Sequence, residues 1–150
     1  MHIDKDLIFL DPKIRSIDTL FRMMSAELEK KGWIEADFLN SLIKREERFP
    51  TGLDTGKIKI AVPHTDPDKV IIEGLAVAVI KKPLDFAEMG YPGKRLLPVN
   101  IVFLLLLKKG KVEFYHKLLN KIKNSDILLK IYESGSRQDA CRLLTRSLNI

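Results

Sequence analysis

The chain has 150 residues, of which 45% are hydrophobic and 31% are charged, a composition typical of a folded globular protein rather than a disordered one. Its length fits one domain, so we expect residues 1–150 to form a single domain. The longest apolar stretch, Val99 to Leu107, is far shorter than the roughly 20 residues that a membrane-spanning helix needs, so we expect no direct membrane insertion.

The formal net charge of +6 raises the question of an acidic partner. The lysine pairs Lys30-Lys31, Lys81-Lys82 and Lys108-Lys109 lie far apart, each at the end of an expected element, as on a solvated surface. We therefore expect no nucleic-acid partner, while attraction to an acidic protein stays open. The N-terminus lacks the basic and apolar regions of a signal peptide, so we expect a cytoplasmic protein.

The residues that bind metals are few. The chain has one cysteine, Cys141, and three histidines, none of them at metal-ligand spacing, so we expect no disulfide, metal ion or other cofactor. Gly52-x-x-x-Gly56-Lys57 is superficially similar to a phosphate-binding loop. It has one residue too few between its glycines, and the pattern of a strand follows it where a helix is required.

The N-terminal part of the chain is expected to hold one short strand and two helices. Leu7 to Leu10 has the apolar character of a strand. Asp11-Pro12 has the form of a helix start, because aspartate caps helices and proline fits the first turn. Apolar residues follow at helical spacing until Lys30-Lys31-Gly32 provides stop signals. A second helix is expected from about Ala36 to Glu47.

The middle of the chain is expected to form strands. Ile58 to Val62 alternates between apolar and other residues, and Pro63 ends this strand because proline cannot donate to a sheet ladder. Leu75 to Ile80 is an apolar run of strand length. Val99 to Leu107 is apolar apart from Asn100, as expected of a central strand covered on both faces. Loops rich in proline and glycine are expected at residues 49–56 and 83–95.

The C-terminal third is expected to be helical. Phe114 to Ile122 has helical spacing, Ser125 can cap a segment that runs through Ile131, and Ser136 with Asp139 has the form of a capping box before a last helix. Helices and strands alternate, with enough helices for both faces of a sheet. We therefore predict an α/β fold, in which a mixed β-sheet is sandwiched between α-helices.

His64 is the strongest candidate for a functional residue. It follows Pro63 at the exit of an expected buried strand, and strand ends are where ligand sites gather in open α/β sheets. Neutral imidazole, with an ordinary pKa of about 6.5, can act as a nucleophile and form covalent intermediates. From position alone, a histidine that only hydrogen-bonds at a strand edge is the more common case.

A phosphoryl group on this histidine would need donors nearby. Arg45 ends the second helix and can grip phosphate with two parallel hydrogen bonds or simply be a helix C-terminal charge. On sequence alone, Arg48 is a rival to Arg45. Thr51 and Thr65 can add hydroxyl donors or be turn residues. His116 begins the helix after the long strand, where it either approaches the site from a neighbouring strand end or is merely exposed.

Two motifs carry a resemblance to one known family. The first joins Arg45–Leu53, which contains Arg-Glu and Pro-Thr-Gly, to Ile58–Thr65, which contains Ala-Val-Pro-His. The second joins the strand from Pro98 to Leu105 with His116–Leu119. Together they resemble the fructose/mannitol-type A domains of the phosphoenolpyruvate-dependent sugar phosphotransferase system. The wording Glu-Arg-Phe-Pro-Thr-Gly is most similar to the galactitol-specific A component.

The resemblance covers nearly the whole chain and implies both a fold and an activity. It implies the mannitol-type A domain fold and a phosphotransferase, a phosphocarrier that accepts its phosphoryl group on His64. Arg45, not Arg48, would balance the phosphoryl charge, His116 would support the phosphorylated state, and Thr51 falls on a motif position near the site.

The resemblance also implies partners. HPr would be the donor and a B component (EIIB) on a separate chain the acceptor, for uptake of a sugar or sugar alcohol such as galactitol or fructose. The alternative is a regulatory protein of the same system, which signals through the phosphorylation state of His64 by binding a partner.

Overall fold

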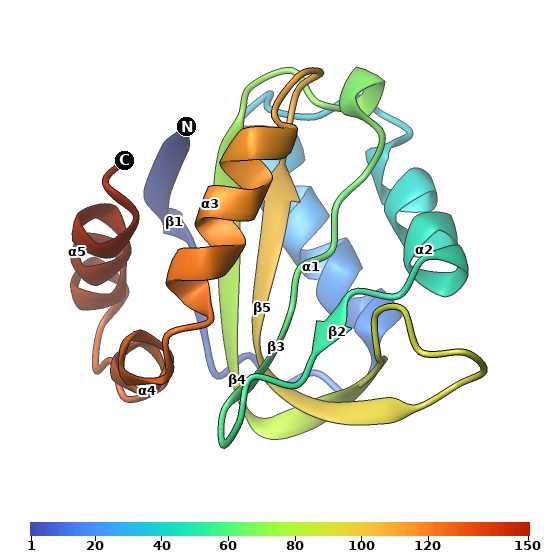
Figure 1. Ribbon diagram of the computed structural model, residues 1–150. Coiled ribbons are helices and arrows are strands. Elements are labelled where there is room, and N and C mark those ends of the chain that lie inside the picture. The colour runs from blue at the N-terminus through green and yellow to red at the C-terminus, as the bar shows by residue number, and fades with distance from the viewer.

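A mixed β-sheet runs through the centre of the molecule (Figure 1). The computed structural model describes residues 1–150 apart from the side chain of Ser125, so the cap predicted there lies outside the described residues. β4 pairs antiparallel with β5, β1 is parallel to β4, β3 is parallel to β5, and β2 closes the edge antiparallel to β3. The strands, in sheet order, are β1 (His2–Leu10), β4 (Gly74–Ala87), β5 (Leu96–Leu106), β3 (Lys59–Ala61) and β2 (Gly52–Leu53).

Helices cover both faces of this sheet, because its central strands are apolar on both sides. In β5, Val102 and Leu104 pack into the core beneath α1 and α2, whereas Phe103 and Leu105 pack into the core beneath α3, α4 and α5. The predicted α/β fold, with a mixed sheet between helices, is therefore confirmed. The helices are α1 (Ile17–Lys30), α2 (Phe38–Arg48), α3 (Val112–Ile122), α4 (Ser125–Tyr132) and α5 (Arg137–Leu148), with a short 3₁₀ segment, η1 (Pro67–Lys69), before β4.

The helix start predicted at Asp11 is wrong. α1 begins at Ile17, and the hydroxyl of its N-cap, Ser16, accepts a hydrogen bond from the backbone N–H of Thr19 at 3.1 Å. Asp11 instead has a φ of 48°, and its N–H donates to the carbonyl of Val79 at 2.7 Å. This bond ties Asp11 to the sheet at the end of β1, so the chain turns there before the helix can begin.

The connection predicted at residues 83–95 is shorter in the structure. β4 continues past Pro83 to Ala87, and Leu84 to Ala87 pair with the first residues of β5. The register shifts between Val79 and Leu84, and this irregularity accommodates the proline inside the strand. The expected loop at residues 49–56 likewise contains β2.

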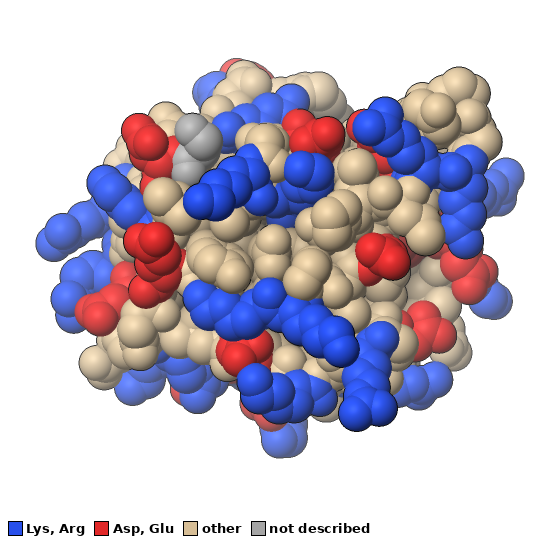
Figure 2. Space-filling view, turned by 90° about the horizontal axis from the view of Figure 1, so that it is seen from below, with Lys and Arg blue, Asp and Glu red and all other residues tan. Residues whose placement is uncertain are grey.

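Two further features are the character of the helices and the distribution of charged side chains on the surface. Among the described residues, no helix has both the length and the apolar character to cross a membrane. Figure 2 views the molecule from below, with Lys and Arg side chains in several groups and Asp and Glu side chains between them.

Candidate functional site

His64 lies just beyond the end of β3 and pairs with β5. The backbone N–H of Leu105 donates to the carbonyl of Pro63 at 3.0 Å, and His64 itself forms a bridge with Leu105. The ring nitrogen Nδ1 lies 2.8 Å from the carbonyl oxygen of Val62. Because a carbonyl only accepts, Nδ1 carries the proton and Nε2 keeps the lone pair. The backbone thus selects the tautomer in which Nε2 has the free lone pair.

The surroundings of His64 keep its ring neutral. Burial lowers the pKa of His64 below its usual value, and the positive charge of Arg45 lowers it further. The hydrogen bond to Val62 and the negative charge of Asp66 act in the opposite direction but do not outweigh burial. A neutral imidazole at cellular pH is the form that can attack an electrophile.

A cleft of about 270 Å³ opens at His64. Its lining residues include Pro67 of η1 and residues 107–111 of the loop between β5 and α3, and Figure 1 shows these two segments at one end of the sheet. Arg45 lines this cleft and forms an ion pair with Asp66 at 2.7 Å, with its side chain one-third exposed. Positive charge is concentrated here, because three further lysines line the same cleft: Lys108, Lys109 and Lys111.

Tyr115, rather than His116, is the residue of α3 that lines the cleft. The Tyr115 ring lies 5.4 Å from the His64 ring, centroid to centroid. His116 is exposed, and its ring centroid lies 5.9 Å from that of Tyr115, its neighbour in α3. The structure therefore brings together His64, Arg45 and Thr65 at the cleft, whereas His116 lies beside Tyr115 and outside the cleft lining.

The two threonines differ in what they contact. Thr65 is buried at the cleft, where its hydroxyl donates to the carbonyl of Asp66 at 3.1 Å. Thr51 is also buried, but its hydroxyl donates to the carboxylate of Glu46 at 2.5 Å and is not part of the cleft lining. Thr51 therefore contacts α2 rather than the space beside His64.

The two candidate arginines are also distinguished. The guanidinium groups of Arg45 and Arg48 lie over the ring of Phe49, at 5.5 and 5.4 Å from its centroid. Of the two, Arg45 lines the cleft, and its charge acts on His64. Arg48 is exposed at the end of α2.

Three residues near His64 were not singled out from sequence. Asp66 follows the Pro-His-Thr motif directly and could have been noticed as a counter-charge for an arginine. Tyr115 precedes the histidine that drew attention, and only the packing of α3 shows which of the two faces the cleft. Glu46 stands beside Arg45 in a charged run, and its burial comes from the fold alone.

Fold and site together define an α/β protein that presents a neutral, tautomerically fixed histidine beside an arginine at the end of a mixed sheet. Residues 1–147 match the family described as "Phosphoenolpyruvate-dependent sugar phosphotransferase system, EIIA 2", and the chain belongs to this family.

Solved structures show the same fold. IIA mannitol from Escherichia coli superposes with a TM-score of 0.76 at 20% identity, over 96% of this chain and 99% of that one. The complex of enzyme IIAMTL and phosphorylated enzyme IIBMTL, from the same organism, gives a TM-score of 0.77 at 19% identity, over 97% and 98%. Nitrogen regulatory protein IIA-Ntr from Neisseria meningitidis gives 0.74 at 26% identity, over 95% of each chain. The mannitol-type fold is thereby confirmed.

A curated relative is much longer than this chain. The transcriptional regulator ManR of Bacillus subtilis (strain 168) is 26% identical over 102 residues, which make up 68% of this chain. The matched part spans 14% of that protein.

Proposed function

We propose that the chain, acting as one EIIA domain, is a phosphocarrier that accepts a phosphoryl group on Nε2 of His64 and passes it to a B component. The observation that carries this proposal is the bond from Nδ1 of His64 to the Val62 carbonyl at 2.8 Å, which directs the lone pair of Nε2 to the reaction. Membership of the EIIA 2 family supports the same role.

The proposed transfer is a displacement at phosphorus. The lone pair of Nε2 forms a new N–P bond while the P–N bond of a donor phosphohistidine breaks, and the donor imidazole leaves with the electron pair. The proton on Nδ1 stays in its hydrogen bond to Val62. Arg45 then turns from Asp66 toward the phosphoryl oxygens, with the lysines at the rim adding positive charge. Thr65 is the proposed hydroxyl at the cleft, and His116 a proposed support at its margin.

The proposed partners and the proposed sugar rest on similarity to members of the family. HPr is the proposed donor. EIIB is the proposed acceptor, supported by the Escherichia coli complex of IIAMTL with phosphorylated IIBMTL. The proposed cargo is a galactitol-like or fructose-like sugar, from the Glu-Arg-Phe-Pro-Thr-Gly motif. A cytoplasmic location follows from such partners.

The test is incubation with phosphoenolpyruvate, enzyme I and HPr, followed by measurement of an acid-labile phosphoryl group on the protein. We expect stoichiometric labelling of the wild type and none of His64→Ala. His2→Ala is the matched control, since it removes an exposed histidine at the far end of the chain. Labelling of His64→Ala at the wild-type level, or no labelling of the wild type, would refute the proposal.

A regulatory role is the second candidate, favoured by the 26% identity to a transcriptional regulator and to IIA-Ntr. Purified phosphorylated protein separates the two. Rapid loss of the phosphoryl group to a B component supports transport, whereas retention of the group, with binding of a partner that depends on it, supports regulation.

A further inference from the structure

Glu46 links α2 to the strand edge that supports His64. Its Oε1 accepts a hydrogen bond from the hydroxyl of Thr51 at 2.5 Å. Burial raises the pKa of Glu46 to about 7, although the bonds with Thr51 act to lower it. Its other oxygen, Oε2, is buried and finds no hydrogen-bond partner within the described part of the chain. A carboxyl group kept in this setting calls for a reason beyond stability, because burying it is costly.

Thr51 connects Glu46 to Val62, the residue whose carbonyl orients the ring of His64. Its carbonyl accepts a hydrogen bond from the N–H of Val62 at 3.3 Å, next to the β2–β3 pair of Gly52 with Ala61. The carbonyl of Val62 in turn holds Nδ1 of His64 at 2.8 Å. Glu46, Thr51, Val62 and His64 are thus joined in series, while Arg45, the neighbour of Glu46 in α2, lines the cleft itself.

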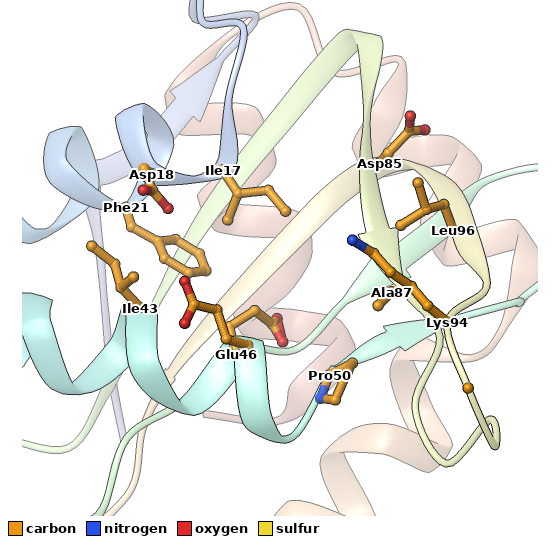
Figure 3. Close-up of a pocket in the computed structure, with 12 residues that line it drawn as sticks. Ile17, Asp18, Phe21, Ile43, Glu46, Pro50, Asp85, Ala87, Lys94 and Leu96 are labelled. Atoms are coloured by element: carbon orange, nitrogen blue, oxygen red, sulfur yellow. The ribbon is translucent and has the colours of Figure 1, made fainter.

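The far side of Glu46 faces a second cavity of about 420 Å³ (Figure 3). Apolar side chains from α1 and α2, such as Phe21 and Ile43, form part of its wall. The other charged groups that line it are Asp18 of α1, Glu47 of α2, Asp85 of β4 and Lys94 of the β4–β5 connection. Three of these four are acidic, so no local excess of positive charge compensates Glu46. Its bond to Thr51 is therefore the specific contact that fixes its direction.

We propose that Glu46 is a positioning residue for phosphoryl transfer: through Thr51 it fixes Val62, and thereby holds His64 in the tautomer whose Nε2 is the nucleophile. The consequence for transfer rests on the proposed function, whereas the effect on the tautomer does not. When Glu46 is ionised its bond with Thr51 is charge-assisted and stronger, so the constraint tightens as the pH rises through about 7.

The first measurement is the tautomer of His64, from the ¹⁵N chemical shifts of its ring in the unphosphorylated full-length protein at pH 8. We expect the wild type to hold the proton on Nδ1, and Glu46→Ala and Thr51→Val to show a mixture of tautomers. Glu46→Gln and Thr51→Ser should retain the wild-type state, because each keeps the hydrogen bond between the two side chains. Glu47→Ala, which removes the exposed neighbouring carboxylate, is the matched control.

The second measurement is the rate of transfer from phosphorylated HPr, by rapid quench between pH 6 and pH 8.5. Glu46→Ala and Thr51→Val should each slow transfer by about tenfold, the order of one net hydrogen bond. The double variant should be no slower than either single one, since both break one series of contacts. The wild-type rate should rise through about pH 7, and Glu46→Gln should lose this step.

The outcomes separate this inference from the proposed function. Should the wild type take up no phosphoryl group, the function fails while the tautomer comparison still decides the role of Glu46. A wild-type tautomer in Glu46→Ala and Thr51→Val, or an equal change in Glu47→Ala, would overturn the inference. Should Glu46→Ala not fold, Thr51→Val against Thr51→Ser makes the same comparison.

Discussion

Arg45 and Glu46 are consecutive residues of α2, yet the helix turns them into opposite environments. Arg45 is one-third exposed, lines the cleft at His64 and pairs with Asp66 at its rim. Glu46 is only partly exposed, its Oε2 is buried, desolvation raises its pKa to about 7, and its Oε1 accepts a hydrogen bond from Thr51. Arg45 therefore faces the cleft, whereas Glu46 contacts the part of the fold that supports the site.

The contrast shows that one turn of α2 can place a positive charge at the cleft and also hold the supporting structure in position. The exposed side of the turn can exchange its partner, because an arginine in water moves from a carboxylate to a phosphoryl group at little cost. The buried side cannot exchange partners without leaving polar atoms unpaired. Changes on the exposed side should therefore act directly on the reaction, and changes on the buried side should act through the His64 tautomer, pH dependence and stability.

The largest effect is expected at Arg45. Arg45→Ala should slow transfer to His64 by roughly 100- to 1,000-fold, or about 3–4 kcal/mol in barrier, as for loss of one charged donor to a developing charge. Arg48→Ala removes the same charge outside the cleft and should change the rate by less than about threefold. Rapid-quench assays with phosphorylated HPr measure both. Equal effects of the two substitutions would remove the distinction between the arginines.

The next effect concerns stability on the buried side. The native protein holds a proton on Glu46 from its usual pKa of 4.5 up to about 7, whereas the unfolded chain releases it near 4.5. The free energy of unfolding should therefore fall as the pH rises through this window, by on the order of 3 kcal/mol from this group. Glu46→Gln cannot ionise and should lack this fall. Urea unfolding at pH 5 and pH 8 tests it, with Glu47→Gln as a control that should behave as the wild type.

A smaller effect is expected where β2 meets β4. A Cβ at Gly52 would lie 2.7 Å from the carbonyl oxygen of Ala87, so Gly52→Ala should push β2 away and lower the free energy of unfolding by about 2 kcal/mol. Gly135→Ala meets nothing within 4 Å and should change it by less than about 0.5 kcal/mol. Since β2 carries the chain from Thr51, Gly52→Ala should also disturb the His64 tautomer. A normal tautomer in this variant would mean that β2 does not transmit strain to His64.

The features that could be predicted from sequence are those that depend on residues adjacent to one another in the chain. The apolar run of β5 from Val99, broken only by Asn100, predicted a strand covered on both faces, and the structure confirms it. The Pro63-His64 end of β3 was likewise visible, because proline stops a strand at a fixed place. Asp11 misled for a tertiary reason, since its N–H belongs to the sheet through Val79 and not to a helix.

Arg45 and Thr65 could be predicted beside His64, whereas Tyr115 and the burial of Glu46 could not, because both depend on how separate elements pack together. The choice between Tyr115 and His116 depends on how α3 is rotated against the sheet, and a rotation of one residue exchanges them. The burial of Glu46 likewise requires α1 and the end of β4 to close over α2. The spacing of residues along the chain predicts neither the rotation of α3 nor the burial of Glu46.

The smallest effect separates these two residues of α3. Burial is the main reason that the pKa of His64 is lowered, and the Tyr115 ring 5.4 Å away contributes to that burial. Tyr115→Ala should therefore raise the pKa of His64 toward its usual value, and NMR titration of the ring measures this. Even at the usual value of about 6.5, roughly three quarters of the imidazole is neutral at pH 7, so transfer there should slow by less than about twofold.

His116→Ala is the matched change on the exposed side of α3, and it should leave the His64 titration unaltered while the protein is still labelled at His64. Any role of His116 in the phosphorylated state would then appear as a change in onward transfer to the B component alone. A shift of the His64 titration in His116→Ala, with none in Tyr115→Ala, would reverse the assignment, because burial by Tyr115 would no longer account for the neutral nucleophile.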